Sequence, residues 1–304
     1  MNFLPKLVRA ALMTGNKSYL NNAFTQRQAV DMPNAIISQT YKAASFRPKL
    51  EAFNTMHNWL GSALHPCFPQ VLGFDQQLSL LLHRSSPFPL MGLVHLNNQI
   101  IINRLPENDD MSLDYQYGNV RFHQKGIVFS VEMSAHQASK LCLSSQSDYL
   151  YRVDPMLLTD SDSSTETDPQ PELKHKPSYD ETVTSDFDGI HLPEQTGRRY
   201  ARISGDYNPI HLSKWSAGLF GFKKPIAHGM HTLALAVSAI HLKRSHNFDS
   251  STIRNEFLNP ALLPCDLQLK NAEQGVVEHF ELINTNASKH KQTVISASIQ
   301  PNAH

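Results

Sequence analysis

The feature that most restricts how this chain can fold is a stretch with almost no apolar side chains near its middle. Residues 159–172 read TDSDSSTETDPQPE and contain no aliphatic or aromatic residue. Such a segment cannot bury enough apolar surface to offset the entropy lost when its backbone is ordered. We therefore expect a flexible acidic linker at residues 157–183, between an N-terminal domain at 1–156 and a C-terminal domain at 184–304. A chain of 304 residues is long enough for each domain to bury its own core.

Composition argues against several classes of protein. Lys plus Arg and Asp plus Glu number 27 each, so the net charge is zero. A nucleic-acid binder needs a basic face, and we expect no nucleic-acid partner. The three cysteines, Cys67, Cys142 and Cys265, are far apart and form no Cys-x-x-Cys pair. Sparse cysteines of this kind indicate free thiols in a reducing compartment, and we expect a cytoplasmic protein.

Metal binding and membrane insertion also find little support. His228 and His231 lie one helical turn apart, but no third ligand has a recognisable spacing, so we expect no metal. The apolar run Thr232–Ile240 is far shorter than the roughly 20 residues that cross a bilayer, and it predicts a buried helix instead. Residues 1–13 are basic and apolar but are interrupted by Pro5, which favours a surface helix over a targeting segment.

The C-terminal half begins with a helix and continues with strands. His228–Leu242 is apolar nearly all round, which predicts a helix buried on every face. Val276–Ile283 is rich in strand formers, and Thr293–Ile299 alternates apolar and polar residues. Asn284–Lys289 between them has the composition of a hairpin turn.

The N-terminal half has a similar order of elements. Val71–Leu82 predicts an apolar helix, and strand-like runs follow at Gly92–Ile102, Gly126–Met133 and Tyr149–Val153. A buried helix followed by several antiparallel strands thus occurs twice. The sequence therefore predicts the α+β class, built from a duplicated unit.

The stretch that carries chemistry begins at Tyr200. Gly205 and Pro209 bracket Asp206 and Asn208 and predict a turn of restricted backbone freedom. Such a turn can aim Asp206, Asn208 and His211 at one point. A carboxylate and an imidazole can both exchange protons near neutral pH, so they could activate one water molecule. Taken alone, Asp-x-Asn-Pro is also a common turn or helix-cap sequence.

His228 and Gly229 open the predicted buried helix. The first N–H groups of a helix have no intrahelical partner and lie at the positive end of its dipole. Gly229 has no Cβ, so a substrate oxygen could approach its N–H closely, as an oxyanion site requires. The same pair could also mark nothing more than the start of a helix.

These pieces occur in an order that resembles a known family. Ser204-Gly-Asp-x-Asn-Pro-Ile-His211, followed by Gly221-Phe-x-x-Pro-Ile-Ala-His-Gly-Met230, resembles the signature of MaoC-like, R-specific enoyl-CoA hydratases. Phe68–Phe74 and Ser86–His95 resemble the first domain of two-domain relatives. The resemblance implies a double hot-dog, in which each of two antiparallel sheets wraps a central helix. The N-terminal half lacks the signature and would be a degenerate copy.

The resemblance also implies roles for individual residues. Asp206 and His211 would flank the water that adds to a trans-2-enoyl thioester, and the Gly229 N–H would stabilise the enolate oxygen. Which of the two side chains makes which proton transfer stays open. Asn208 could orient the water or simply hold the turn, and the same two readings apply to Ser204.

Substrate contacts and cofactors follow from the same resemblance. Ser204, His228, Lys223 and Lys224 are candidate substrate-binding residues. Arg198 and Arg199 could also meet phosphates, although such basic residues are often only solvated. No metal or organic cofactor is expected, because the thioester itself accepts the electrons.

Coenzyme A is the favoured carrier of the acyl group. Two alternatives stay open: a dehydratase for acyl-carrier protein in fatty-acid or polyketide synthesis, and a non-catalytic acyl-binding scaffold. A fused pair of domains could work as a monomer or as a homodimer of double hot-dogs.

Overall fold

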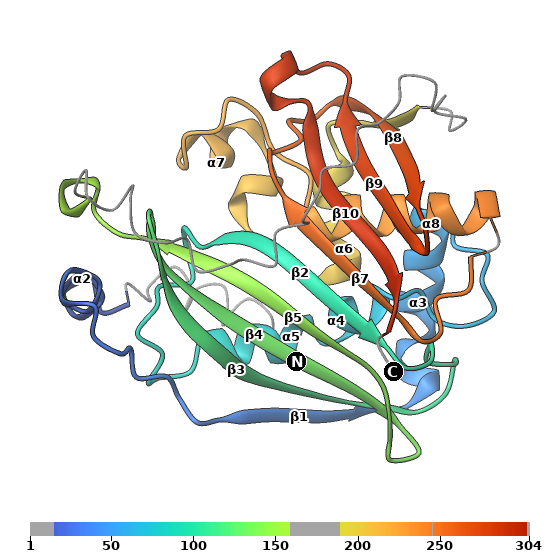
Figure 1. Ribbon diagram of the computed structural model, residues 1–304, viewed down its shortest axis with the longest axis horizontal. Helices are drawn as coiled ribbons and strands as arrows, with labels where there is room; N and C mark the ends of the chain where they lie inside the picture. Colours follow the sequence, from blue (N-terminus) through green and yellow to red (C-terminus); the bar gives the residue numbers. More distant parts are fainter. Residues whose placement is uncertain (1–14, 159–188, 245, 303–304) are drawn as a thin grey trace.

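The computed structural model describes residues 15–158, 189–244 and 246–302, with no side-chain description at residue 244 (Figure 1). The predicted surface helix at residues 1–13 lies outside the described residues. Residues 159–183 of the predicted linker also lie outside the described residues. The proposed domain boundaries therefore stay predictions, and the two halves are described below by their elements.

Within the described residues, ten strands form one antiparallel sheet in the order β1-β3-β4-β5-β2-β7-β10-β9-β8-β6. Each strand of the first half has a counterpart five strands later, equally distant from the central β2–β7 pair. This symmetry supports the predicted duplication. The strands are β1 Ile36–Tyr41, β2 Val94–Ile102, β3 Met111–His123, β4 Gly126–Gln137, β5 Lys140–Arg152, β6 Ile190–Leu192, β7 Ser251–Phe257, β8 Cys265–Gln274, β9 Val277–Asn284 and β10 Thr293–Pro301.

The helix predicted at Val71–Leu82 is wrong as a single element. The chain forms two short helices, α4 (Phe68–Leu72) and α5 (Phe74–Leu81), separated at Gly73. The Tyr115 ring packs so closely here that a Cβ on Gly73 would lie only 2.6 Å from it, so only glycine fits between the two helices. In the described part of this half, the other helices are α2 (Lys17–Gln26) and α3 (Ala43–His57).

The second half is built around α8 (Gly229–Arg244), which confirms the predicted buried helix to within two residues at each end. Strands β7 to β10 curve over this helix, and α3 of the first half runs beside it (Figure 1). Two short helices precede it, α6 (Thr196–Ser204) and α7 (Lys214–Gly218). The described residues also include three single turns of 3₁₀ helix: η1 (Pro155–Leu157), η3 (Pro209–His211) and η4 (Lys289–Lys291).

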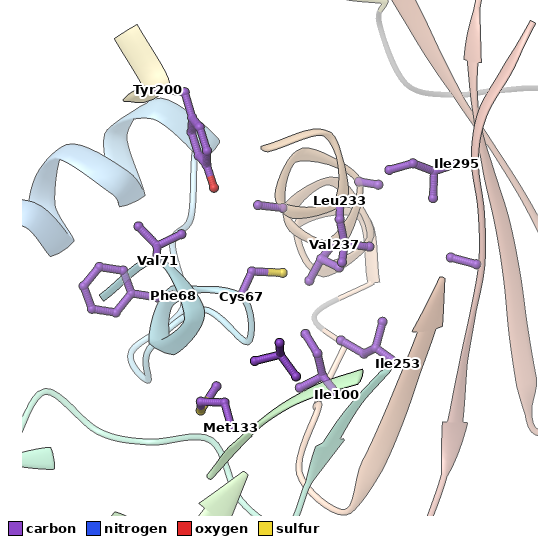
Figure 2. Close-up of a cluster of buried hydrophobic side chains, with 14 of the residues drawn as sticks. Cys67, Phe68, Val71, Ile100, Met133, Tyr200, Leu233, Val237, Ile253 and Ile295 are labelled. Carbon is purple, nitrogen blue, oxygen red and sulfur yellow. The ribbon is translucent and has the colours of Figure 1, made fainter. Parts of the chain in front are cut away.

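One hydrophobic core runs through both halves. Ile100 of β2 pairs with Ile253 of β7, and both side chains are fully buried. Figure 2 shows them below Leu233 and Val237 of α8, with Cys67 and Phe68 of the first half to the left. Burying an aliphatic side chain of this size stabilises the fold by about 1.5–3 kcal/mol. The two halves are therefore held together by core packing as well as by the β2–β7 ladder.

The predicted strands are confirmed, although several are longer than expected. The strand predicted at Gly126–Met133 continues to Gln137 in β4. The one predicted at Tyr149–Val153 covers only the last part of the 13-residue β5. Helices beside one antiparallel sheet confirm the α+β class. No helix in the described part of the chain has the length and apolar character needed to cross a membrane.

Candidate active site

The site begins where α6 ends. Gly205 adopts the left-handed conformation (φ 86°) and its N–H bonds the Ala201 carbonyl oxygen, which terminates the helix. The buried Ser204 hydroxyl donates to the Tyr200 carbonyl oxygen and accepts the Asp206 N–H, each at 3.1 Å. Ser204 thus fixes the start of the loop, and this placement favours its structural reading. The Asp206 carboxylate is left about 30% exposed.

Asn208 holds the next turn. Its N–H donates to Asp206 Oδ1 at 3.1 Å, and its own Oδ1 caps the 3₁₀ turn η3 by accepting the Ile210 N–H. Gly197 of α6 packs directly against η3, since a Cβ at Gly197 would be 2.0 Å from the His211 carbonyl oxygen. The helix and the 3₁₀ turn therefore pack with their backbones in contact, which positions His211.

His211 is buried and held in one tautomer. Its Nδ1 lies 2.8 Å from the Ile226 carbonyl oxygen, and because a carbonyl only accepts, Nδ1 carries the hydrogen. Nε2 is then left with a lone pair. Burial lowers the pKa of His211 below its usual value, although the Asp206 charge acts in the opposite direction. The ring is therefore a neutral base at neutral pH.

His228 connects the loop to the start of α8. Its Nε2–H donates to the Asp206 carbonyl oxygen at 3.0 Å, and Nε2 lies 3.9 Å from Asp206 Oδ2. Its ring stacks on His211, with centroids 3.6 Å apart, and also contacts Tyr200. Burial holds the pKa of His228 well below its usual value, so this ring is also neutral. Its role here is to orient neighbours rather than to carry charge.

Gly229 is the first residue of α8, where the N–H groups have no intrahelical acceptor. Both Gly229 and Met230 are partly exposed, so this end of the helix is accessible. The Phe257 ring covers the Cα of Gly229, because a Cβ would lie 2.7 Å from Phe257 Cε1. Gly229 thus lies at a partly exposed helix start and leaves the space that Phe257 occupies.

Sequence reasoning missed the residues that the N-terminal half brings to this site. Burial raises the pKa of the Tyr149 hydroxyl, and the nearby Asp206 charge raises it further. Gln77 Nε2 donates to the same hydroxyl at 2.5 Å. His95 stacks on Tyr149 and lies tilted against Phe257, with its centroid 4.7 Å from that of each ring. These aromatic rings form a wall from the first half to Gly229, and no local motif marks them.

The remaining predicted residues do not join this cluster through any described contact. Lys223 and Lys224 are exposed on the loop before His228, and Arg198 and Arg199 are exposed on α6. His231 turns toward the first half instead, where its Nδ1 lies 2.8 Å from His57 Nε2. The His228–His231 spacing therefore does not bring these two rings together as a pair of metal ligands.

A different set has the ligand types of a metal site. Asp206, His211 and His228 each place one potential ligand atom within 4.8 Å of the others. However, His228 Nε2, which lies 3.9 Å from Asp206 Oδ2, already donates its hydrogen to the Asp206 carbonyl oxygen. That N–H cannot coordinate a cation while it makes this bond. Nδ1 of the same ring makes no hydrogen bond, so it is the His228 nitrogen that keeps a lone pair.

Comparison with known proteins agrees with this geometry. The family model of the MaoC like domain matches residues 166–295. The chain is 27% identical over 214 residues to 3-hydroxyacyl-thioester dehydratase X of Mycobacterium tuberculosis, covering 70% of this chain and 71% of that protein. It is 54% identical over 39 residues to the peroxisomal enoyl-CoA hydratase 2 of Arabidopsis thaliana, but this covers only 13% of each chain.

Solved structures show the fold. The crystal structure of HtdX from Mycobacterium tuberculosis has a TM-score of 0.66 at 22% identity, covering 87% of this chain and 99% of that one. A MaoC-like dehydratase from Phytophthora capsici also gives 0.66, at 16% identity, covering 90% and 96%. The predicted double hot-dog fold is thereby confirmed.

Proposed function

The C-terminal half carries a MaoC-like domain, and from this premise we propose that the chain interconverts trans-2-enoyl and (R)-3-hydroxyacyl thioesters by adding or removing water. Thioesters of coenzyme A are the first substrates to test. The Mycobacterium relative is named as a dehydratase of 3-hydroxyacyl thioesters, which supports the reaction class. The R configuration rests on the motif between Ser204 and Met230.

One observation carries the proposal. The Asp206 carboxylate and a ring nitrogen of His211 come within 4.8 Å of each other, close to the accessible start of α8. This spacing leaves room for a water molecule that bonds both groups, since each bond needs about 2.6–3.2 Å. A base and an oxyanion donor on the same side of the loop are the two features that hydration requires.

In the hydration direction, the water loses a proton to this pair as its oxygen bonds to C3 of the enoyl thioester. The C2–C3 π electrons move toward the thioester carbonyl, and negative charge gathers on its oxygen. The N–H of Gly229, at the positive end of α8, stabilises that charge. A proton returned to C2 by the Asp206–His211 pair completes the addition. Dehydration follows the same steps in reverse.

The protonation states support this assignment. Burial lowers the pKa of His211, so its Nε2 is free to accept a proton at neutral pH, while Nδ1–H stays fixed on Ile226. Either His211 or Asp206 can take the first proton, because both face the same water position. No metal or organic cofactor is required in this scheme, since the thioester carbonyl accepts the electron pair.

The test uses crotonyl-CoA and follows the loss of the enoyl thioester absorbance. We expect turnover by the unchanged protein and a fall of at least about 10²-fold in Asp206→Asn and His211→Ala, since each removes a proton-transfer group. His290→Ala, a change at an exposed 3₁₀ turn, is the matched histidine control. Circular dichroism should show that all variants fold.

The product's configuration tests the stereochemistry, because only an R product agrees with the proposal. Equal rates in the unchanged protein and Asp206→Asn would contradict the catalytic assignment. If the thioester bound without reacting, on crotonyl and longer enoyl chains alike, the protein would be an acyl-binding scaffold.

A further inference from the structure

An exposed apolar surface lies between the two catalytic segments of the chain. Trp215 is 78% exposed, Leu219 is 68% exposed and Phe220 is 37% exposed, all on α7 or the turn that follows it. Single exposed apolar residues are ordinary, but three within six positions, one of them a tryptophan, form a group. Aromatic residues with large exposed area are typical anchors of protein interfaces.

The charged side chains around the same segment are all positive. From Tyr207 to Phe248 the sequence contains five Lys or Arg residues and no Asp or Glu, in a chain whose two signs of charge balance overall. Three of these cations, Lys214, Lys223 and Lys224, are exposed and lie within four positions of the apolar group in the sequence. We call the six residues the α7 patch: Lys214, Trp215, Leu219, Phe220, Lys223 and Lys224.

The α7 patch is fixed to the catalytic loop. Ser213 caps α7 by accepting the Ser216 N–H at 3.1 Å, and the Ser216 hydroxyl donates to the Pro209 carbonyl oxygen at 2.7 Å. Beyond the patch, the Ile226 N–H donates to the Ile210 carbonyl oxygen at 3.0 Å. Both anchors are on η3, the turn that carries His211. A partner held on the patch is therefore held next to the catalytic residues.

We propose that the α7 patch docks an acidic carrier domain that presents the acyl group as a phosphopantetheine thioester. The lysines would pair with carboxylates of the carrier, and the exposed Trp215 and Leu219 would pack on its apolar side chains. The site then serves carrier-bound thioesters as well as those of coenzyme A. This inference rests on the proposed function and names a partner for the same site.

Charge and size together favour this occupant. Coenzyme A could use the lysines for its phosphates, but it lacks the apolar protein surface that would cover both Trp215 and Leu219. An anionic membrane would suit the same charges. However, α7 has only five residues, whereas helices that lie in the membrane interface need a longer apolar face. A compact acidic protein satisfies both the cations and the apolar side chains.

The kinetic test compares one acyl group on two carriers: crotonyl-CoA, and crotonyl-phosphopantetheine on a purified acidic acyl carrier protein. Two variants disrupt the patch, Trp215→Ala with Leu219→Ala, and Lys214→Glu. For each we expect kcat/KM on the carrier protein to fall at least about tenfold, mainly through KM, as for loss of interface anchors. With crotonyl-CoA it should stay within about twofold, because no patch residue mutated here touches the reacting groups.

Val276→Ala and Lys289→Glu are the matched controls. Val276 is also 78% exposed, but on the β8–β9 turn, and Lys289 is an exposed lysine of η4. Neither change should affect either substrate. An equal loss on both substrates in the patch variants would overturn the proposal, because it would indicate a structural role for α7.

A binding measurement separates this inference from the catalytic proposal. The chain has two tryptophans, and Trp59 is only 4% exposed, so a blue shift of emission reports on Trp215. Asp206→Asn protein is titrated with a tryptophan-free acyl carrier protein. A saturable blue shift that Lys214→Glu weakens supports docking. No shift, with crotonyl-CoA still hydrated by the unchanged protein, overturns the docking inference and leaves the proposed function intact. A shift only with phosphatidylglycerol vesicles would assign the patch to membranes.

Discussion

The imidazole rings of His211 and His228 stack with their centroids 3.6 Å apart and their planes inclined by 24°. Each ring also donates one N–H to a backbone carbonyl, His211 to Ile226 and His228 to Asp206. Burial lowers the pKa of both rings, and a charge on His211 would lower the pKa of His228 further. The stack therefore keeps two neutral histidines in fixed tautomers beside one carboxylate.

The His228→Phe variant tests the orienting role of His228. Phenylalanine can keep the stack on His211 but loses the N–H that holds the Asp206 carbonyl. A neutral hydrogen bond contributes about 1 kcal/mol, so turnover should fall about fivefold if the bond acts mainly in the transition state. His228→Ala should fall further, because it removes both contacts. Steady-state rates with an enoyl thioester measure the effect, and unchanged turnover in His228→Phe would reduce the ring to a packing role.

Gly197 offers a structural test of how His211 is positioned. A Cβ at this position would lie 2.0 Å from the His211 carbonyl oxygen, so Gly197→Ala must move η3 away from α6. We expect a lower melting temperature and a large loss of turnover. Gly218→Ala is the control, because a Cβ at Gly218 meets nothing within 4 Å. Thermal melts and rates for the two variants should differ, and equal behaviour would show that the backbone contact is unimportant.

The loop from Asp206 to His211 could be predicted because its signal is local. Asp206, Asn208 and His211 lie within six positions, and the turn that gathers them is made by side-chain to backbone bonds across two residues. The start of α8 is equally local, since it depends on the composition of one helix. Such features are encoded by nearby residues, and the structure places them as neighbours.

The rest depends on contacts between residues far apart in the chain. His57 and His231 are 174 positions apart, and Tyr149 reaches the site from a strand of the other half. The Tyr115 ring on β3 leaves no room for a Cβ at Gly73, a contact that no helical pattern around Gly73 reveals. Packing against distant partners overrode the local pattern in each case. Strand pairing and the aromatic wall beside Gly229 could not be predicted for the same reason.

Tyr149 provides a test of the contribution of the N-terminal half. Tyr149→Phe removes a hydroxyl that is bonded to Gln77 and lies within electrostatic reach of Asp206. The Gln77 amide then lacks its partner, which costs about 1–3 kcal/mol of stability, and kcat/KM should fall several-fold. Tyr117→Phe is the matched control, because its hydroxyl bonds Leu80 and Ser86. If both variants lost only stability, Tyr149 would have no role in the reaction.

Buried histidines should make the protein sensitive to acid. Burial lowers the pKa of His57 to about 4, whereas an unfolded histidine titrates near 6.5. Between these values the unfolded state binds more protons, so the free energy of unfolding decreases as the pH falls from about 6.5 to about 4. His57 should account for about 3 kcal/mol of the free energy of unfolding, which is present in full above about pH 6.5 and lost as the pH falls to about 4. Burial lowers the pKa of His65 and His231 in the same direction.

Urea midpoints measured at several pH values in this window test the prediction. His57→Phe should flatten the dependence on pH, even if it lowers stability at neutral pH by leaving the His231 Nδ1–H without its acceptor. Replacing the exposed His290 with Gln should leave the slope unchanged. A stability that is constant from pH 6.5 to 4 would contradict the buried, neutral state of these rings.

One pair of variants can separate the proposed oxyanion role of Gly229 from its packing against Phe257. Gly229→Ala places a Cβ 2.7 Å from Phe257 Cε1, so it should overpack this region and destabilise the fold by about 1–3 kcal/mol. Phe257→Leu, added in the same chain, removes the ring edge and should restore much of the melting temperature. If the Gly229 N–H stabilises the enolate oxygen, the double variant should still turn over about 10²–10³-fold more slowly than Phe257→Leu alone, because the Cβ keeps the substrate oxygen away. Recovery of both stability and turnover would instead mean that glycine is needed only to accommodate Phe257.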